Sequence, residues 1–239
     1  MKTIGLLGGM SWESTASYYR LINQGVRAAL GSLHSAQLVM LSVDFDPIAK
    51  LQHDGNWDET GRLLAENARR IQAAGADFLA ICANTMHIVA PQIESAVDIP
   101  VLHIADATAE VLIERGIRTA GLLGTAFTME EDFYKGRLQR KHGIDVLIPD
   151  AQDRRRVHDI IYQELCLGEQ RASSRAEFVR IIADLAARGA GGVILGCTEI
   201  GMLVQQSDTS VMLLDTTILH ADKLVKAALE GETERKRRS

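Results

Sequence analysis

Short apolar runs alternate with amphipathic helical patterns along nearly all of this 239-residue chain. Apolar runs bounded by turn or polar residues are typical of buried strands, and apolar residues at helical spacing are typical of helices that cover a sheet. Because repeated strand–helix alternation builds βαβ units, we predict an α/β fold with mostly parallel sheets. The expected strands are TIGLLGG, QLVMLSVD, FLAICAN, VLHIAD, TAGLLGT, DVLIPD, GVILGCT and VMLLDT.

The two halves of the chain resemble each other in sequence. Residues 2–9 (KTIGLLGG) match residues 118–125 (RTAGLLGT), and residues 73–85 (AAGADFLAICANT) match residues 187–199 (ARGAGGVILGCTE). The later segments VLHIADAT and VMLLDTT also match. Three matches in the same order predict a duplicated α/β lobe.

The third match pairs Asp106 with Asp215. We predict two pseudo-symmetric lobes, each a mostly parallel sheet flanked by helices, with the active site in the interlobe cleft. The expected parts are a first lobe of residues 1–108 plus 216–230, a second lobe of residues 109–215, and a charged, disordered tail of residues 231–239.

Composition places the chain among ordinary soluble globular proteins, with 46% hydrophobic and 24% charged residues. No apolar run reaches membrane-spanning length, and the N-terminus lacks the apolar core of a signal peptide. A net charge of -5 argues against a general nucleic-acid partner, and three cysteines in no metal-ligand spacing argue for a reducing compartment. We therefore expect a cytoplasmic protein with no nucleic-acid or membrane partner and no bound metal.

The motif ICANTMH, residues 81–87, concentrates polar side chains at the end of an expected strand. A strand sends neighbouring side chains to opposite faces, so Cys82 and Ala83 cannot both face one site. The internal match pairs Ala83 with Cys197, and Cys82 with Gly196. Because parallel sheets bind ligands beyond the carboxyl ends of their strands, we expect Ala83 and Cys197 to face the substrate and Cys82 to be a packing residue.

Cys197 lies in Gly196-Cys197-Thr198-Glu199, where a strand is expected to meet a loop or a helix start. Backbone N–H groups at such a place stabilise an anion, so we expect this thiol to ionise near neutral pH. The alternative is a buried, inert cysteine, which is common for this residue type. The flanking Gly196 and Thr198 and the matching motif favour the reactive interpretation. Cys166, which follows the apolar helical stretch VHDIIYQEL, is expected to be a packing residue.

A glycine-bearing turn, GLLGGMS (residues 5–11), follows the first expected strand. Glycines there let backbone amides approach an anionic ligand. The dinucleotide spacing is not met and the Walker lysine is missing, so we favour a carboxylate cradle over a nucleotide site. Gly124 and Thr125 would supply the counterpart from the second half. Short side chains at the matching strand ends suit the same task, although each also suits a helix cap; these are Asn84, Thr85 and Thr198.

Four further polar residues have competing interpretations. His87 could assist proton transfer, or it could cap or pack at a helix start. Gln52 follows the second expected strand and could reach the site. Asp106 and Asp215 are expected to stabilise loops or helix starts rather than act as bases.

Together these motifs resemble the aspartate/glutamate racemase family, in which activity needs neither pyridoxal phosphate nor metal. The resemblance extends from Met1 to about Leu229. It is carried by IGLLGGMSWEST, ANTMH, LHIADAT, GLLGT, ELCLG and GCTEI. Within the family the chain is most similar to bacterial members that act on aspartate and glutamate. The resemblance implies no cofactor, an aspartate or glutamate substrate, and a homodimer.

The resemblance also implies a mechanism in which two residues on opposite faces of the substrate α-carbon exchange its proton. That proton is only weakly acidic, so a thiolate needs a site that excludes water and fixed donors on the carboxylate. Family members carry one cysteine before the Asn-Thr pair and another in GCTE, here Cys197. The implied substrate-binding residues are Met10, Gln52, Asn84, Thr85, Thr125, Thr198 and Glu199, with His87 as an auxiliary candidate.

The first cysteine position departs from the family pattern, because Ala83 has no proton to give or take. Three explanations stay open. The chain is an impaired or slow racemase that still binds substrate; or water, Thr85 or His87 supplies the second acid; or Cys197 acts alone from one side on a dicarboxylate, as in arylmalonate decarboxylase. The remaining alternative is that the chain is not an enzyme but a protein that binds an amino acid without turning it over.

Overall fold

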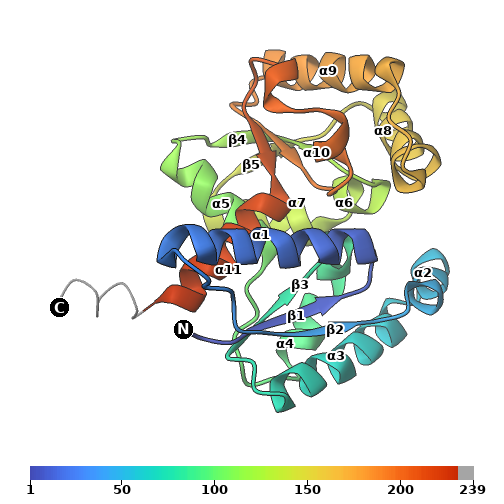
Figure 1. Ribbon diagram of the computed structural model, residues 1–239. Helices are drawn as coiled ribbons and strands as arrows, with labels where there is room; N and C mark the ends of the chain where they lie inside the picture. The colour runs from blue at the N-terminus through green and yellow to red at the C-terminus, as the bar shows by residue number, and fades with distance from the viewer. Residues whose placement is uncertain (231–239) are drawn as a thin grey trace. The chain divides into compact units, whose positions relative to one another are not determined.

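The computed structural model describes residues 1–230, which divide into two compact units. The first unit comprises Met1–Ile104 together with residues 220–230, and the second comprises Ala105–Leu219. Each unit is a parallel sheet with helices packed on it (Figure 1). The predicted α/β fold with two parallel-sheet lobes is therefore confirmed, whereas the predicted tail lies outside the described residues.

The first unit is built on a three-stranded parallel sheet in the order β2-β1-β3. Its strands are β1 (Ile4–Gly8), β2 (Leu38–Ser42) and β3 (Phe78–Ile81). Its helical segments are α1 (Trp12–Leu30), α2 (Phe45–His53), α3 (Trp57–Ala73), η1 (Thr85–Val89), α4 (Ala90–Glu94) and the part of α11 (Thr216–Leu229) from His220 onward.

Alternate residues of this sheet pack into two separate apolar cores, because successive strand side chains point to opposite faces. On one face Leu6 and Cys82 pack with α1 and α11, including Tyr18 and Leu224. The other core comprises strand residues together with α3, η1 and α4, and its members include Leu7, Leu64, Leu79, Ile81, Met86 and Ile93. Helices thus cover both faces of the sheet (Figure 1).

The second unit repeats this plan with one more strand, in the order β5-β4-β6-β7. Its strands are β4 (Thr119–Leu123), β5 (Asp145–Leu147), β6 (Val193–Leu195) and β7 (Leu213–Asp215). Its helical segments are α5 (Ile104–Glu114) from Ala105 onward, α6 (Ala126–Glu130), α7 (Asp132–His142), α8 (Ala151–Gln163), η2 (Leu165–Leu167), α9 (Ala172–Ala187), α10 (Ile200–Leu203), η3 (Gln206–Asp208) and the part of α11 before His220.

Strand register shows the duplication at the level of single residues. Gly5 lies opposite Leu79 in the first sheet, and Gly121 lies opposite Val193 in the second. These are the pairs that the internal sequence match predicts. A Cβ on Gly5 would lie 2.7 Å from Ile71 Cγ2 in α3, and a Cβ on Gly121 would lie 3.0 Å from Leu185 Cδ1 in α9. The same glycine therefore lets the equivalent helix pack closely in both units.

The match between the last strands was wrong in its register. VLHIAD does not form a full strand, because only Val101 bridges to Leu79 before α5 begins. The corresponding pair in the second unit is Leu213 and Val193. This register makes Asp215, two residues after Leu213, equivalent to His103 and not to Asp106. Strand pairing therefore identifies the equivalent residues of the two units, whereas the shared aspartate in the two segments does not.

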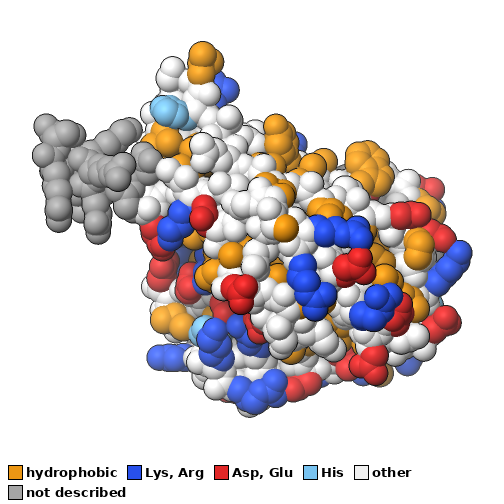
Figure 2. Space-filling model, turned by 90° about the horizontal axis from the view of Figure 1, so that it is seen from below, with side chains coloured by type: hydrophobic (Ala, Val, Ile, Leu, Met, Phe, Trp, Pro, Cys, Tyr) orange, Lys and Arg blue, Asp and Glu red, His pale blue; other side chains and the backbone are white. Residues whose placement is uncertain are grey.

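The described surface carries charges of both signs. Figure 2 shows acidic and basic side chains interspersed over one face of the molecule. On α3, Arg62 pairs with Glu59 and Arg70 pairs with Glu66. Exposed pairs of this kind contribute little to stability. Among residues 1–230, no helix is both long and apolar enough to cross a membrane.

Candidate active site

The second unit presents its candidate site residues beyond the carboxyl ends of β4, β6 and β7. Thr125 follows β4, Cys197 follows β6, and Thr217 follows β7. β4 pairs with β6, and β6 pairs with β7, so their ends lie along one edge of the sheet. Ligand sites of parallel sheets form at this edge.

Cys197 and Glu199 form a hydrogen-bonded pair in this loop. Cys197 Sγ donates to Glu199 Oε2, with 2.8 Å between the two atoms. Both residues are half-buried. Burial, and then the charge and hydrogen bond of Glu199, raise the pKa of the Cys197 thiol well above its usual range. The pair is therefore a neutral thiol beside a carboxylate that can accept its proton.

This arrangement contradicts our expectation that Cys197 ionises near neutral pH through a helix start. The helix that follows, α10, is only one turn long and begins at Ile200. Its few backbone N–H groups offer little stabilisation, whereas the adjacent carboxylate repels a thiolate. Glu199 was expected to bind substrate, so the sequence analysis missed its contact with the thiol.

Thr198 is joined to the end of the neighbouring strand. Thr198 Oγ1 lies 3.2 Å from Thr217 Oγ1, a residue that the sequence analysis did not single out. Asp215 accepts hydrogen bonds from the backbone amides of Thr217 and Ile218, at 2.9 and 3.2 Å. Burial raises the pKa of Asp215 despite these two opposing bonds. Asp215 thus holds the start of α11, which agrees with the structural role expected for it.

Thr125 caps the helix that follows β4. Its hydroxyl oxygen accepts a hydrogen bond from Thr128 N at 3.4 Å, and the side chain is buried. Next to it, the backbone N–H of Ala126 donates to His158 Nδ1 at 3.1 Å. The backbone N–H groups of Ala126 and Thr128 at the start of α6 therefore donate to side chains of the protein itself.

In the first unit, the strand-parity argument for Cys82 and Ala83 is confirmed. Cys82 is fully buried in the core that contains Leu6 and Tyr18, and burial raises the pKa of its thiol. Ala83 is only half-buried and packs against the opposite core. Cys82 therefore cannot stand in for a thiol at position 83.

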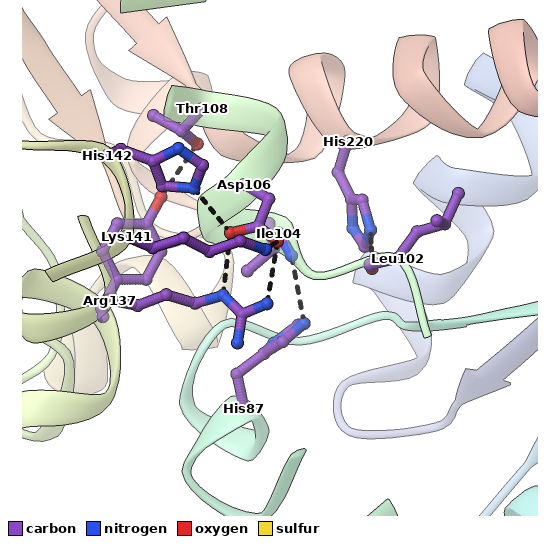
Figure 3. Close-up of polar contacts among 10 residues, drawn as sticks. His87, Leu102, Ile104, Asp106, Thr108, Arg137, Lys141, His142 and His220 are labelled. Atoms are coloured by element: carbon purple, nitrogen blue, oxygen red, sulfur yellow. Dashed lines mark hydrogen bonds and ion pairs between the residues drawn. The ribbon is translucent and has the colours of Figure 1, made fainter. Parts of the chain in front are cut away.

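Asn84, Thr85 and His87 lie in the turn and short helix that follow β3. Asn84 is buried, including its side-chain oxygen, and Thr85 is the half-buried first residue of η1. His87 is buried, with Nδ1 2.8 Å from the carbonyl oxygen of Ala83. Its other ring nitrogen, Nε2, accepts a hydrogen bond from Ile104 N at 3.3 Å (Figure 3). Both ring nitrogens therefore bond to the backbone.

The glycine turn after β1 does not present the expected backbone cradle at Gly9. Its backbone N–H donates to Thr15 Oγ1 at 2.8 Å. Gly9 has φ 97°, and a Cβ there would lie 2.2 Å from the carbonyl oxygen of Val43. The glycine therefore serves close backbone approach inside the fold rather than an anion.

Met10 and Gln52 are both buried. Met10 is part of the apolar core that also contains Ile48 of α2 and Met86 of η1. Gln52 lies one turn after Ile48 on α2 and is 5% exposed. α2 follows β2 directly, which brings Gln52 into the same unit as Ala83 and Asn84.

Cys166 lies in η2, the short helix that follows α8. Cys166 is exposed in η2, so its expected packing role was wrong; η2 interrupts the helical periodicity that suggested burial.

Asp106 accepts hydrogen bonds from Arg137, Lys141 and His142 of α7 (Figure 3). Burial opposes ionisation, but these three bonds outweigh it and hold the pKa of Asp106 well below its usual range. Asp106 thus has a structural role, but it joins α5 to α7 and does not stabilise a loop or a helix start as expected.

Within residues 1–230, no cluster of three or more histidine, cysteine or acidic side chains is arranged to hold a metal ion. The described strand ends present a thiol, a carboxylate, hydroxyls and an amide. A thiol beside a proton-accepting carboxylate suits proton transfer to and from carbon.

Comparison with known proteins assigns the chain to a family. The family model described as Asp/Glu/Hydantoin racemase matches residues 7–224. A crystal structure of a candidate Asp/Glu racemase from Yersinia pestis is 52% identical, with a TM-score of 0.92 and coverage of 96% of this chain and 100% of that one. An aspartate racemase homologue from Pyrococcus horikoshii OT3 is 34% identical, with a TM-score of 0.85 and coverage of 95% and 99%.

A further relative is more distant in sequence. The broad specificity amino-acid racemase RacX of Bacillus subtilis is 23% identical over 231 residues, which cover 95% of this chain and 98% of that protein. The family match and the two similar structures extend over both units. This chain belongs to the Asp/Glu/hydantoin racemase family.

Proposed function

We propose that the protein is a cofactor-independent amino-acid racemase that acts on aspartate or glutamate through the thiol of Cys197. The observation that carries the proposal is the 2.8 Å hydrogen bond from Cys197 Sγ to Glu199 Oε2 at the carboxyl end of β6. Family membership supports racemisation in general.

Glu199 supplies what Cys197 needs in order to act as a base. A thiol whose pKa is well above neutral is a poor base until its proton has somewhere to go. Transfer of that proton to Glu199 creates a thiolate and, at the same time, neutralises the carboxylate that opposed it. The thiolate then removes the α-proton, and the resulting thiol can return it.

The position of Ala83 determines how far the reaction can go. Inversion needs a second acid on the opposite face of the substrate α-carbon, and a methyl group cannot supply one. We propose that Cys197 serves one face and that residue 83 occupies the place of the opposing acid. Return of the proton to that face then depends on water or on Thr85, which makes inversion slow.

Polar side chains at the strand ends would bind the substrate. Asn84, Thr85 and Thr198 are short donors suited to the α-carboxylate, and fixed donors at that group lower the barrier to α-proton removal. Gln52 and Glu199 would meet the amino group or the side-chain carboxylate. Thr125 and Met10 would contribute by holding the neighbouring turns, since Thr125 caps α6 and Met10 lies in an apolar core.

A second candidate function follows from the alanine itself. With no thiol at position 83, Cys197 would exchange or deliver a proton from one face only, as a one-base decarboxylase or isomerase of a dicarboxylate does. The half-buried methyl group of Ala83, packed on the apolar core, favours this candidate over rapid two-base racemisation.

One experiment separates these functions. L- and D-aspartate and L- and D-glutamate are each incubated with the protein in deuterated water, α-deuterium uptake is followed by NMR, and the same samples are analysed for chirality. Uptake with inversion supports the racemase. Uptake from one enantiomer without inversion supports the one-sided enzyme. Saturable binding without uptake would refute both and leave a binding protein.

A further inference from the structure

We infer that His87 is a positioning residue, which holds the turn from Ala83 to Thr85 by joining Ala83 to Ile104, and that it does not replace the missing second acid. The inference rests on the proposed function, because it concerns the same substrate-binding turn. It concerns residues of the first unit alone.

Hydrogen-bond geometry determines the protonation of the His87 ring. The backbone N–H of Ile104 can only donate, so His87 Nε2 must accept and carries no proton. Nδ1 lies 2.8 Å from the carbonyl oxygen of Ala83, which can only accept, so Nδ1 carries the proton. His87 is therefore a neutral imidazole in the Nδ1–H tautomer, bonded to the backbone at both nitrogens.

The backbone segment that leads to Ile104, whose N–H donates to His87 Nε2, is itself held in place by hydrogen bonds. Leu102 N donates to Leu79 O at 2.8 Å, next to the bridge between Leu79 and Val101, so this segment runs along β3. The carbonyl of Leu102 also accepts a hydrogen bond from His220 Nε2 at 2.7 Å (Figure 3). His220 Nδ1 lies 2.8 Å from the hydroxyl of Tyr18. His87 thus connects the turn after β3 to a segment that is held from two sides.

The turn gains its orientation from this connection. Ala83 O accepts from the His87 ring, and Asn84 O accepts from the backbone N–H of His87 at 3.0 Å. Two consecutive carbonyls are therefore held by one residue. Consequently the Asn84 side chain and the hydroxyl of Thr85 leave the turn in a set direction, which is what fixed carboxylate donors require.

The same contacts argue against His87 as an acid. To donate a proton from Nε2, the ring would have to place an N–H against the N–H of Ile104 and lose that bond. The ring is 1% exposed, so a charge on it would be poorly solvated. The ring of His103 also lies 4.3 Å away between centroids, so protonation of both would bring two cations together in the interior.

Two isosteric variants separate the roles of the two nitrogens. His87→Asn places an amide N–H near the position of Nδ1 and keeps the bond to Ala83 O. His87→Gln places an amide oxygen near the position of Nε2 and keeps the bond from Ile104 N. We expect each variant to raise the KM for aspartate or glutamate about tenfold, the effect of one lost hydrogen bond, because each keeps only one of the two bonds that join Ala83 to Ile104. For both variants kcat for α-deuterium uptake should stay within about threefold of wild type.

Other outcomes overturn the inference. Loss of kcat in both variants with KM unchanged would identify His87 as an acid or base. Equal destabilisation of both variants with unchanged KM would show a role in folding alone.

Imidazole NMR of the wild-type protein labelled with ¹⁵N-histidine gives a test that does not depend on activity: the Nδ1–H tautomer should persist between about pH 6 and 8. The opposite tautomer or an imidazolium there would refute the assignment. If the wild-type protein shows no α-deuterium uptake but His87 has the expected tautomer, the proposed function is refuted. The positioning role of His87 between Ala83 and Ile104 would then still hold.

Discussion

The thiol of Cys197 donates its hydrogen bond to the carboxylate of Glu199, two residues further along the same loop. This contact reverses the usual way of activating a cysteine, in which a cation or a helix start lowers the thiol pKa. Here the neighbour raises the pKa and also offers a place for the proton. A reaction that needs a thiol for one step and a thiolate for the next can use both properties.

Removing the Glu199 charge should make Cys197 more reactive towards alkylation. Burial remains in Glu199→Gln, but the opposing charge is gone, so the thiol pKa should fall and the thiolate fraction at pH 7.5 should rise about tenfold for each unit of that fall. The measurement is the rate of iodoacetamide labelling of Cys197 between about pH 7 and 10. It is made in a Cys166→Ser background because Cys166 is exposed.

Glu114→Gln is the matched control for this labelling experiment, since Glu114 is an exposed acid at the end of α5. The control should label at the parental rate at every pH. Labelling of Glu199→Gln that is no faster than the parent would show that Glu199 does not hold the thiol in its protonated form.

Introducing a thiol at position 83 should increase racemisation. In the proposed mechanism, Ala83→Cys would supply the opposing acid-base group, and a general acid of this kind contributes about 10²- to 10⁴-fold. Ala83→Ser is the matched control, because a hydroxyl of similar size has a much higher pKa and should give far less. Chiral analysis of aspartate and glutamate measures both. Equal rates for wild type, Ala83→Cys and Ala83→Ser would contradict the assignment of position 83.

The acid stability of the protein should depend on Asp106. Arg137, Lys141 and His142 favour its charged form, so its folded pKa lies below the unfolded value of about 3.9. The stabilisation is complete above that value and decreases as the pH falls through the folded pKa. Asp106→Asn should reduce the free energy of unfolding by about 2–4 kcal/mol near pH 7, because it removes the buried carboxylate of a partly buried charge network.

The deficit of Asp106→Asn should shrink as the pH falls below about 4, where the unfolded wild-type chain gains a proton that the folded protein resists. Urea denaturation at several pH values measures it. Asp184→Asn, which removes the exposed partner of Arg188, serves as control and should change stability little. A deficit that is independent of pH would mean that packing, and not charge, explains the effect.

The fold followed from patterns that operate over short distances. Strand–helix alternation predicted parallel sheets, and the internal match predicted that Gly5 and Gly121 occupy equivalent positions, as their partners Leu79 and Val193 confirm. The pairing of Asp106 with Asp215 was wrong, because it relied on an identical residue type and not on strand register. Pairing of the segment around Val101 depends on a single bridge, which no local pattern signals.

The site was less predictable because it depends on side-chain partners. Strand parity separated Cys82 from Ala83, since alternation is a property of the backbone. The Cys197–Glu199 contact could have been suspected from an acid two residues after the cysteine, but its effect on the thiol pKa required the observed geometry. The partners of the Gly9 amide and of the His87 ring are hydrogen bonds that only the folded chain defines.

The glycine turn after β1 should tolerate no side chain at Gly9. A Cβ there meets the Val43 carbonyl oxygen at 2.2 Å on a backbone with φ 97°. Gly9→Ala should therefore lower the free energy of unfolding by about 2–3 kcal/mol or more. Gly55→Ala is the control, because its φ is 68° but a Cβ would meet nothing within 4 Å, and it should cost only about 1 kcal/mol. Equal losses in urea denaturation would show that backbone conformation alone matters at Gly9.

The most direct test of the central assignment is α-deuterium uptake into aspartate and glutamate by wild type, Cys197→Ser and Cys166→Ser. Cys197 is the thiol that we propose removes the α-proton, and Cys166 is an exposed thiol of the same unit. We predict uptake by wild type and by Cys166→Ser at similar rates, with loss of about 10²-fold or more in Cys197→Ser. Uptake that persists undiminished in Cys197→Ser would contradict the account.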